Sequence, residues 1–167
     1  MLISLAGLPG TGKTTIARAV ATRLRAVHLR LDTVEQALVD SGAHTHPVGP
    51  VGYHVARALA GDHLRQGLVV VADCVNPVAV TRDLWREVAR AAGTGLLEVE
   101  VVCSDPARHR ERVATRTGGV PGMPLPTWEE VAAARPDPWT RDHLVLDTAR
   151  GTVQECAAAV VEAFDRA

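Results

Sequence analysis

The chain has 167 residues, of which 47% are hydrophobic and 22% are charged, a composition that fits one globular domain with a sizeable core. Its formal net charge is −1 and its basic residues form no tail, which argues against a protein that wraps nucleic acid. The three cysteines are isolated, which argues against a disulfide framework or a zinc site. No run approaches the ~18 apolar residues of a membrane span and no charged leader precedes the first apolar run, so we expect a cytoplasmic protein.

The first predicted elements are a strand, a glycine loop and a helix. Residues 2–6 are an apolar run typical of a buried strand, and residues 14–24 have helical periodicity. Between them lies Gly7-Leu8-Pro9-Gly10-Thr11-Gly12-Lys13-Thr14, a full match to the phosphate-loop pattern G-x-x-x-x-G-K-[ST]. Glycines let backbone N–H groups turn toward phosphate oxygens, and the helix N-terminus adds partial positive charge. A simple glycine turn before a helix is the alternative, which the four matched positions disfavour.

We therefore expect this loop to bind the phosphates of a nucleotide. Lys13 is the only lysine of the chain, and its compact ammonium can reach between two phosphates and assist catalysis. The Thr14 hydroxyl can bind Mg²⁺. The guanine-binding motif N-K-x-D needs a second lysine, so the sequence favours ATP. The predicted nucleotide-binding residues of the loop are Gly7, Leu8, Pro9, Gly10, Thr11, Gly12, Lys13, Thr14 and Thr15.

Further apolar runs alternate with helical patterns along the rest of the chain. Strands are expected at 27–31, 68–72, 96–102 and 144–146, and helices at 33–40, 51–66, 78–92, 106–117, 128–134 and 152–165. This alternation predicts a three-layer α/β fold, a five-stranded parallel sheet with helices on both faces. Functional groups should gather where the carboxyl ends of the strands open. Residues 1–167 are expected to form a single domain.

Two aspartates follow predicted strands at this edge. Asp73 ends the third strand, where an acid can orient Mg²⁺ or contact the substrate; an aspartate that only starts a turn is the alternative. Asp32 follows the second strand, and Asp32-Thr33-Val34-Glu35 also looks like a capping box at the start of the next helix. We expect Asp32 to accept the proton of a hydroxyl substrate.

Arginines are concentrated on the predicted helix 106–117. Arg108, Arg112 and Arg116 are four residues apart and should share one helix face. With the glycine- and proline-rich stretch 118–126, the region of about 105–126 is predicted to form a lid that folds cations over the transferring phosphoryl group. A solvated arginine face is the alternative. Arg82 is a weaker candidate for contacting an anionic substrate.

The pattern resembles the small P-loop kinases grouped with AAA-type ATPase domains, among them chloramphenicol phosphotransferase, gluconate kinase, adenylylsulfate kinase and the kinase module of polynucleotide kinases. It also resembles bacterial proteins named only as AAA family ATPases. The residues that carry the resemblance are the phosphate loop, Asp32, Asp73, Asn76, Arg82, Arg112, Arg116 and the segment 146–148.

The resemblance implies a strand order of 2-3-1-4-5 and ATP-dependent phosphoryl transfer to a hydroxyl. It implies that Asp32 is the base or a substrate ligand, that Asp73, Asn76 and Arg82 lie near the substrate, and that Arg112 and Arg116 act from the lid. The turn at 147–150 would lie near the adenine.

The sequence therefore predicts a kinase, monomeric or homodimeric, that uses ATP and Mg²⁺ to phosphorylate a hydroxyl of a small molecule. Two other functions remain open. A 5′-hydroxyl polynucleotide kinase is disfavoured by the nearly neutral charge, and a nucleotide-dependent regulatory ATPase would bind a partner without phosphoryl transfer.

Overall fold

The computed structural model of the protein describes residues 1–117 and 119–167, so Gly118 of the predicted lid lies outside the described residues. Its sheet is all-parallel, with the strand order β2-β3-β1-β4-β5. The strands are β1 Leu2–Ala6, β2 Val27–Arg30, β3 Val70–Asp73, β4 Leu96–Val102 and β5 Leu144–Asp147. The predicted three-layer α/β fold and its strand order are confirmed.

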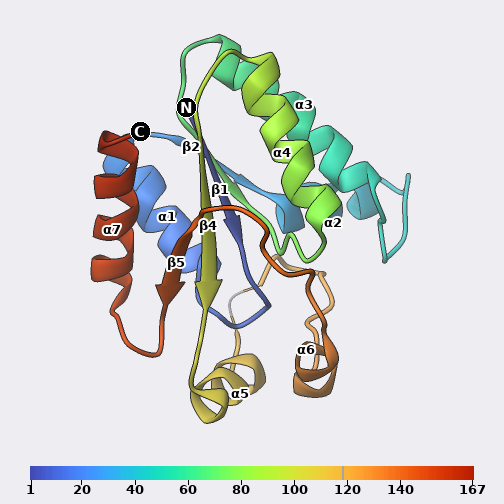
Figure 1. The fold of residues 1–167 in the computed structure, drawn as a ribbon. Coiled ribbons are helices and arrows are strands. Elements are labelled where there is room, and N and C mark those ends of the chain that lie inside the picture. The colour runs from blue at the N-terminus through green and yellow to red at the C-terminus, as the bar shows by residue number, and fades with distance from the viewer. Residues whose placement is uncertain (118) are drawn as a thin grey trace.

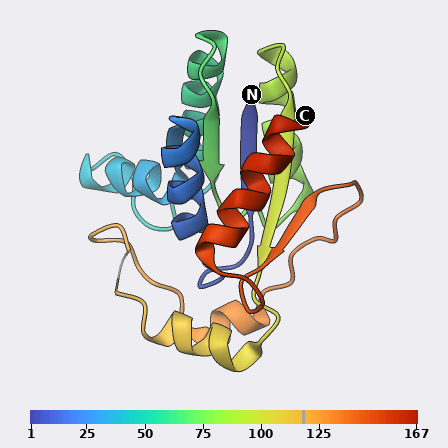
Figure 2. The same ribbon diagram turned by 90° about the vertical axis from the view of Figure 1, so that its left-hand side faces the viewer.

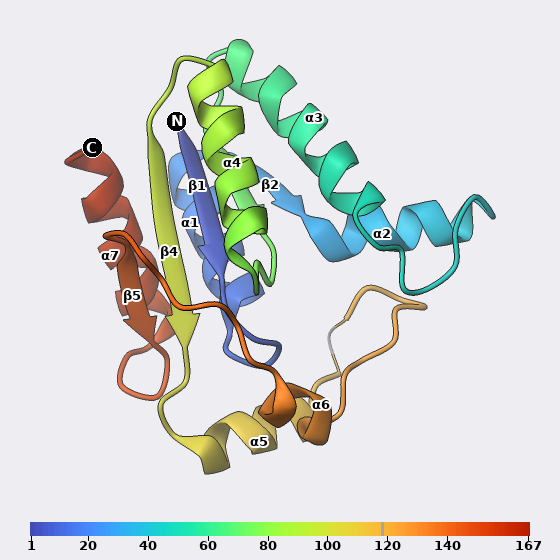
Figure 3. The same cartoon turned by 45° about the vertical axis from the view of Figure 1, so that its right-hand side comes forward.

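Helices cover both faces of the sheet (Figure 1). Figure 2 shows α1 (Lys13–Leu24) and α7 (Val153–Asp165) lying over one face. On the other face lie α3 (Val51–Arg65) and α4 (Ala79–Ala91), with α2 (Leu31–Asp40) packed against α3. The short helices α5 (Pro106–Ala114) and α6 (Trp128–Ala133) lie beyond the carboxyl ends of the strands (Figure 3).

The core divides into two clusters because successive side chains of a strand point to opposite faces. On β1, Ile3 and Leu5 pack against α1 and α7, whereas Leu2 packs against α3 and α4. Trp85 of α4 is fully buried in the second cluster. Both faces are thus apolar, and the polar groups that could perform chemistry are left to the ends of the strands.

Two helix boundaries differ from the prediction in ways that matter for the site. Helix α2 begins at Leu31, and its N-cap is Arg30, with no side-chain cap bond. Asp32 therefore lies inside the first helical turn, and the predicted capping box is wrong. Helix α5 ends at Ala114, so Arg116 lies beyond the helix. Within the described ranges, no helix is both long and apolar enough to cross a membrane.

Candidate functional site

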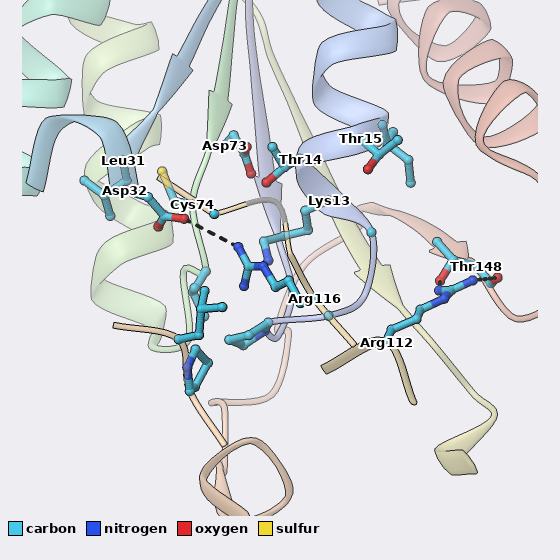
Figure 4. Close-up of a pocket in the computed structure, with 18 of the residues that line it drawn as sticks. Lys13, Thr14, Thr15, Leu31, Asp32, Asp73, Cys74, Arg112, Arg116 and Thr148 are labelled. Carbon is cyan, nitrogen blue, oxygen red and sulfur yellow. Dashed lines mark hydrogen bonds and ion pairs between the residues drawn. The ribbon is translucent and has the colours of Figure 1, made fainter. Parts of the chain in front are cut away.

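A cavity of about 960 Å³ opens at the carboxyl edge of the sheet (Figure 4). Its wall combines the phosphate loop, the first turns of α1 and α2, the end of β3, helix α5, segment 119–126 and the turn at 148–153. Segments far apart in the sequence thus meet around one space, as expected where the strands of a parallel sheet end.

The phosphate loop has the backbone that an anion site needs. At Gly7, where φ is +141°, a Cβ would lie 2.2 Å from the Val101 carbonyl oxygen, so only glycine fits. Gly12 precedes α1 with φ of +95°, and α1 has neither a side-chain cap nor an acidic residue in its first turn. Gly10, Gly12 and residues 13–15 line the cavity, whereas Gly7, Leu8 and Thr11 lie outside it. Because the N–H groups at the start of a helix attract anions, this part of the loop fits a nucleotide phosphate.

Lys13 and Asp73 are buried charged residues that line the cavity. Lys13 is 8% exposed, and its Nζ donates to the Leu8 carbonyl oxygen at 3.2 Å. Burial lowers the pKa of Lys13, against the opposing charges of Asp73 and Asp32. Burial also acts to raise the pKa of Asp73, but the His28 hydrogen bond, the Lys13 charge and the Thr14 hydroxyl hold it below its ordinary value.

Oxygen donors suited to a magnesium ion lie beside Lys13. The Thr14 side chain lies next to the Asp73 carboxylate (Figure 4). A hydroxyl and one carboxylate, completed by phosphate oxygens and water, are the ligands that Mg²⁺ takes in nucleotide sites. His28 Nε2 donates to Asp73 Oδ2 at 3.3 Å and fixes that carboxylate. The residues present therefore fit Mg²⁺.

Asp32 faces the same cavity. Its Oδ2 accepts a hydrogen bond from Arg30 at 2.8 Å and lies 4.0 Å from the guanidinium of Arg116. Arg116 extends between Lys13 and Asp32 (Figure 4). Four of the predicted residues, Lys13, Asp32, Asp73 and Arg116, are thus brought together around one space.

Arg108 and Arg112 point away from Arg116. Arg112 donates to the Thr148 hydroxyl at 2.7 Å and to the Thr148 carbonyl at 3.1 Å, and Arg108 donates to the Ala149 carbonyl at 2.8 Å. All three arginines line the cavity, but they do not share one helix face, because α5 ends before Arg116. That part of the lid prediction is wrong. Arg108 and Arg112 face the turn that follows β5, and Arg116 faces Asp32.

Helix α5 is hydrogen-bonded to the phosphate loop and packs against it. His109 Nε2 donates to the Pro9 carbonyl at 2.8 Å, and the Thr148 hydroxyl donates to the Thr11 carbonyl at 2.8 Å. A Cβ at Gly10 would lie 2.5 Å from Cγ2 of Val113. The sequence did not indicate His109, and it included Thr148 only in the segment 146–148 that carries the family resemblance. A polar residue inside the apolar run of β2 was the one signal for His28.

Asn76 and Arg82, predicted to lie near the substrate, are outside this cavity. Asn76 is 2% exposed, donating to the Leu5 carbonyl at 2.9 Å and accepting from Trp85 at 3.1 Å. Arg82 is 4% exposed; it donates to the carbonyls of 137 and 138 and lies 4.5 Å from the Trp139 ring. Burial and internal bonds occupy their polar groups, so in this structure both residues join α4 to the strands and to the segment before β5.

Beyond Asp32 the cavity wall contains residues that the sequence did not indicate as functional. Glu35 of α2, Tyr53 of α3 and Thr81 of α4 lie there. Glu35 is half-buried, and burial together with the nearby charge of Asp32 raises its pKa. Burial also raises the pKa of Tyr53 well above its ordinary value. This end of the cavity is lined by α2, α3 and α4, and it lies opposite the turn that holds Arg108 and Arg112.

Comparison with known proteins relates this chain to a family with a phosphate loop and to kinases. The model of the AAA domain family matches residues 2–138. The chain is 26% identical over 172 residues to the "Probable adenylyl-sulfate kinase" of Aeropyrum pernix, covering 92% of this chain and 86% of that protein.

Two solved structures show the same fold over nearly the whole chain. The Mycobacterium tuberculosis APS kinase CysC, in complex with AMPPNP and APS, is 19% identical, with 98% of this chain and 96% of that chain covered and a TM-score of 0.70. A gluconokinase from Sinorhizobium meliloti 1021 is 20% identical, with 98% and 93% covered and a TM-score of 0.64. With its phosphate loop, its fold and the family match over residues 2–138, the chain belongs to the AAA domain family of P-loop kinases and is a kinase-like nucleotide-binding protein.

Proposed function

We propose that this protein is a kinase that uses ATP and Mg²⁺ to transfer the γ-phosphate to a hydroxyl of a small molecule. The observation that carries the proposal is the 4.0 Å approach of Arg116 to Asp32 in the cavity that Lys13 also lines. Transfer to a hydroxyl needs a group that accepts the hydroxyl proton and cations that offset the charge of the phosphoryl group. Both kinds of group meet here.

The donor nucleotide would bind at the loop of residues 7–15. Lys13 would contact the β- and γ-phosphates, and the N–H groups at the start of α1 would contact phosphate oxygens. Arg108 and Arg112 lie at this end, beside the turn at 148–150, which supports a nucleotide-binding role for both. ATP as donor is supported by the AMPPNP complex of the related APS kinase.

Thr14 and Asp73 are the residues that would hold Mg²⁺. When bound, the ion offsets phosphate charge and orients the phosphates. His28 contributes by fixing the Asp73 carboxylate through the 3.3 Å hydrogen bond. Asp73 is 3% exposed, so its orientation is determined by the protein rather than by solvent.

Asp32 would accept the proton of the acceptor hydroxyl. The hydroxyl oxygen forms the new bond to the γ-phosphorus while the bond from that phosphorus to the departing ADP oxygen breaks, and the proton passes to the Asp32 carboxylate. Lys13 and Arg116 offset the negative charge on the transferring group. Arg30, bonded at 2.8 Å and 7% exposed, orients the Asp32 carboxylate.

The test compares Asp32→Asn with Asp62→Asn, a matched change at an exposed aspartate outside the cavity. ADP formation is measured with a panel of hydroxyl acceptors, and ATP binding is measured by calorimetry. Asp32→Asn should keep ATP affinity and lose acceptor-dependent turnover by about 10²–10⁴-fold, while Asp62→Asn should match the parent protein. In Asp32→Asn, Arg30 loses its charged partner. Thermal unfolding of both variants therefore checks that they remain folded.

Three outcomes would contradict the proposal. Unchanged turnover in Asp32→Asn excludes Asp32 as the base. ATP binding without ADP formation for any acceptor excludes a small-molecule kinase and favours a regulatory ATPase. Oligonucleotide binding that weakens steeply with salt favours a polynucleotide kinase.

A further inference from the structure

Glu35 is a half-buried carboxylate that the proposed reaction does not use. In residues 1–117 and 119–167 its side chain makes no hydrogen bond and no ion pair. It lies against the first turn of α3, where a Cβ at Gly52 would be 2.6 Å from its Cγ and 3.1 Å from its Oε1. Any larger residue at position 52 would collide with Glu35, so glycine there allows Glu35 to lie in the cavity wall.

The other carboxylates of this part of the cavity are already paired with basic side chains. Asp32 is bonded to Arg30 and approached by Arg116, and Asp73 is bonded to His28. The remaining arginines of the cavity wall belong to α1, α5 and the turn after β5, not to the wall formed by α2, α3 and α4. Glu35 thus gives this end of the cavity a negative charge that no described side chain offsets.

The N–H groups at the start of α3 do not stabilise the negative charge of Glu35. An acid near a helix N-terminus normally gains from the N–H groups there, and that interaction lowers its pKa. Helix α3 has no side-chain cap bond, and the pKa of Glu35 is raised by burial and by the charge of Asp32. A partly buried carboxylate without a partner is costly, and a cation bound beside it would remove that cost.

We infer that the acceptor carries a protonated amine in addition to its reactive hydroxyl, and that Glu35 binds this amine. The inference rests on the proposed function, because it assigns the wall opposite the donor end to the acceptor. Asp32 receives the hydroxyl proton, and Glu35 fixes the position of the amine. Adenylyl sulfate, named in two relatives, is an anion, so this protein would take an acceptor of a different charge class.

The test uses two sets of hydroxyl compounds matched in skeleton: glucosamine, glucose and gluconate, and 2-aminoethanol, ethylene glycol and glycolate. They are added to a wider panel of amino alcohols, neutral alcohols and hydroxy acids. For each compound, ADP formation is measured with the parent protein and with a Lys13 variant, and only the part that depends on Lys13 is counted. Amine-bearing members should be the preferred acceptors. Glu35→Gln should lower kcat/KM for the amines by about 10- to 100-fold, with little change for neutral members and for ATP affinity.

Two variants make the result specific. Gly52→Ala places a methyl group where Glu35 lies, so it should cause the same selective loss. Glu129→Gln removes an exposed carboxylate on α6, outside the cavity, and should match the parent protein. Preference for hydroxy acids or neutral alcohols, or an equal loss for all three classes in Glu35→Gln, overturns the inference while the kinase proposal stands. Absence of turnover with every acceptor overturns the proposed function, and the inference with it.

Discussion

Replacing Gly10 tests how closely helix α5 packs on the phosphate loop. Its φ is +84°, and a Cβ there would lie 2.5 Å from Val113 Cγ2 and 3.2 Å from His109 Cδ2. The left-handed backbone costs a non-glycine residue about 1–2 kcal/mol. A valine side chain is stiff, so α5 must shift, which adds about 1–3 kcal/mol. Gly10→Ala should therefore lower the free energy of unfolding by about 2–5 kcal/mol and weaken nucleotide binding.

Gly42 supplies the matched control. Its φ is +77°, and nothing in the described structure lies within 4 Å of a Cβ placed there. Gly42→Ala should lose only the backbone contribution of about 1–2 kcal/mol, with unchanged nucleotide binding. Urea unfolding followed by circular dichroism gives the free energies, and calorimetry gives the affinities. Combining Gly10→Ala with Val113→Ala, compared with Val113→Ala alone, should reduce the penalty to the backbone contribution. Equal losses in the two glycine variants would refute the close contact.

Lys13→Met should abolish measurable ATP binding in calorimetry and leave the melting temperature unchanged or raised, because a buried ammonium whose pKa is lowered by burial is removed. Trp85→Ala should lower the free energy of unfolding by about 3–5 kcal/mol in denaturant titrations, because this side chain is fully buried and donates to Asn76. Glu35→Gln should raise the melting temperature at pH 7. The folded-state pKa of Glu35 is above the unfolded value of about 4.3, so its cost is present at neutral pH. Melting curves against pH should show the gain shrinking as the pH falls through the folded pKa toward about 4.3 and vanishing below that value.

The elements that the sequence predicted well are those set by local composition. Each strand is a short apolar run, and the phosphate loop is a contiguous motif, so neither depends on distant residues. The start of α2 was misplaced because Asp32 has the residue type of a cap, whereas in the fold its carboxylate is taken by Arg30. Whether an aspartate at this position caps the helix or pairs with an arginine depends on partners that the local pattern does not specify.

The parts of the site that the sequence missed depend on register and on contacts between distant segments. In the pairing of β2 with β3, Arg30 lies opposite Asp73. His28 is two residues before Arg30 and so points to the same face of the sheet, which lets it reach Asp73. Thr148 reaches the phosphate loop because β4 and β5 end side by side. His28 belongs to no motif, Thr148 was included only through the resemblance over 146–148, and Glu35 was interpreted only as part of a cap.

The bonds that join α5 to the phosphate loop have a consequence for the entropy of nucleotide binding. His109, Val113 and Arg112 hold this helix in place through protein contacts alone. The conformational freedom of the helix is therefore already lost when the chain folds, and binding does not have to order it again. Segment 119–126 lines the cavity without helix or strand structure, and none of the side-chain bonds above joins it to the phosphate loop, so rearrangement on binding should be larger there than in the preorganised helix. Hydrogen exchange should accordingly slow more in 119–126 than in α5 when ATP is added.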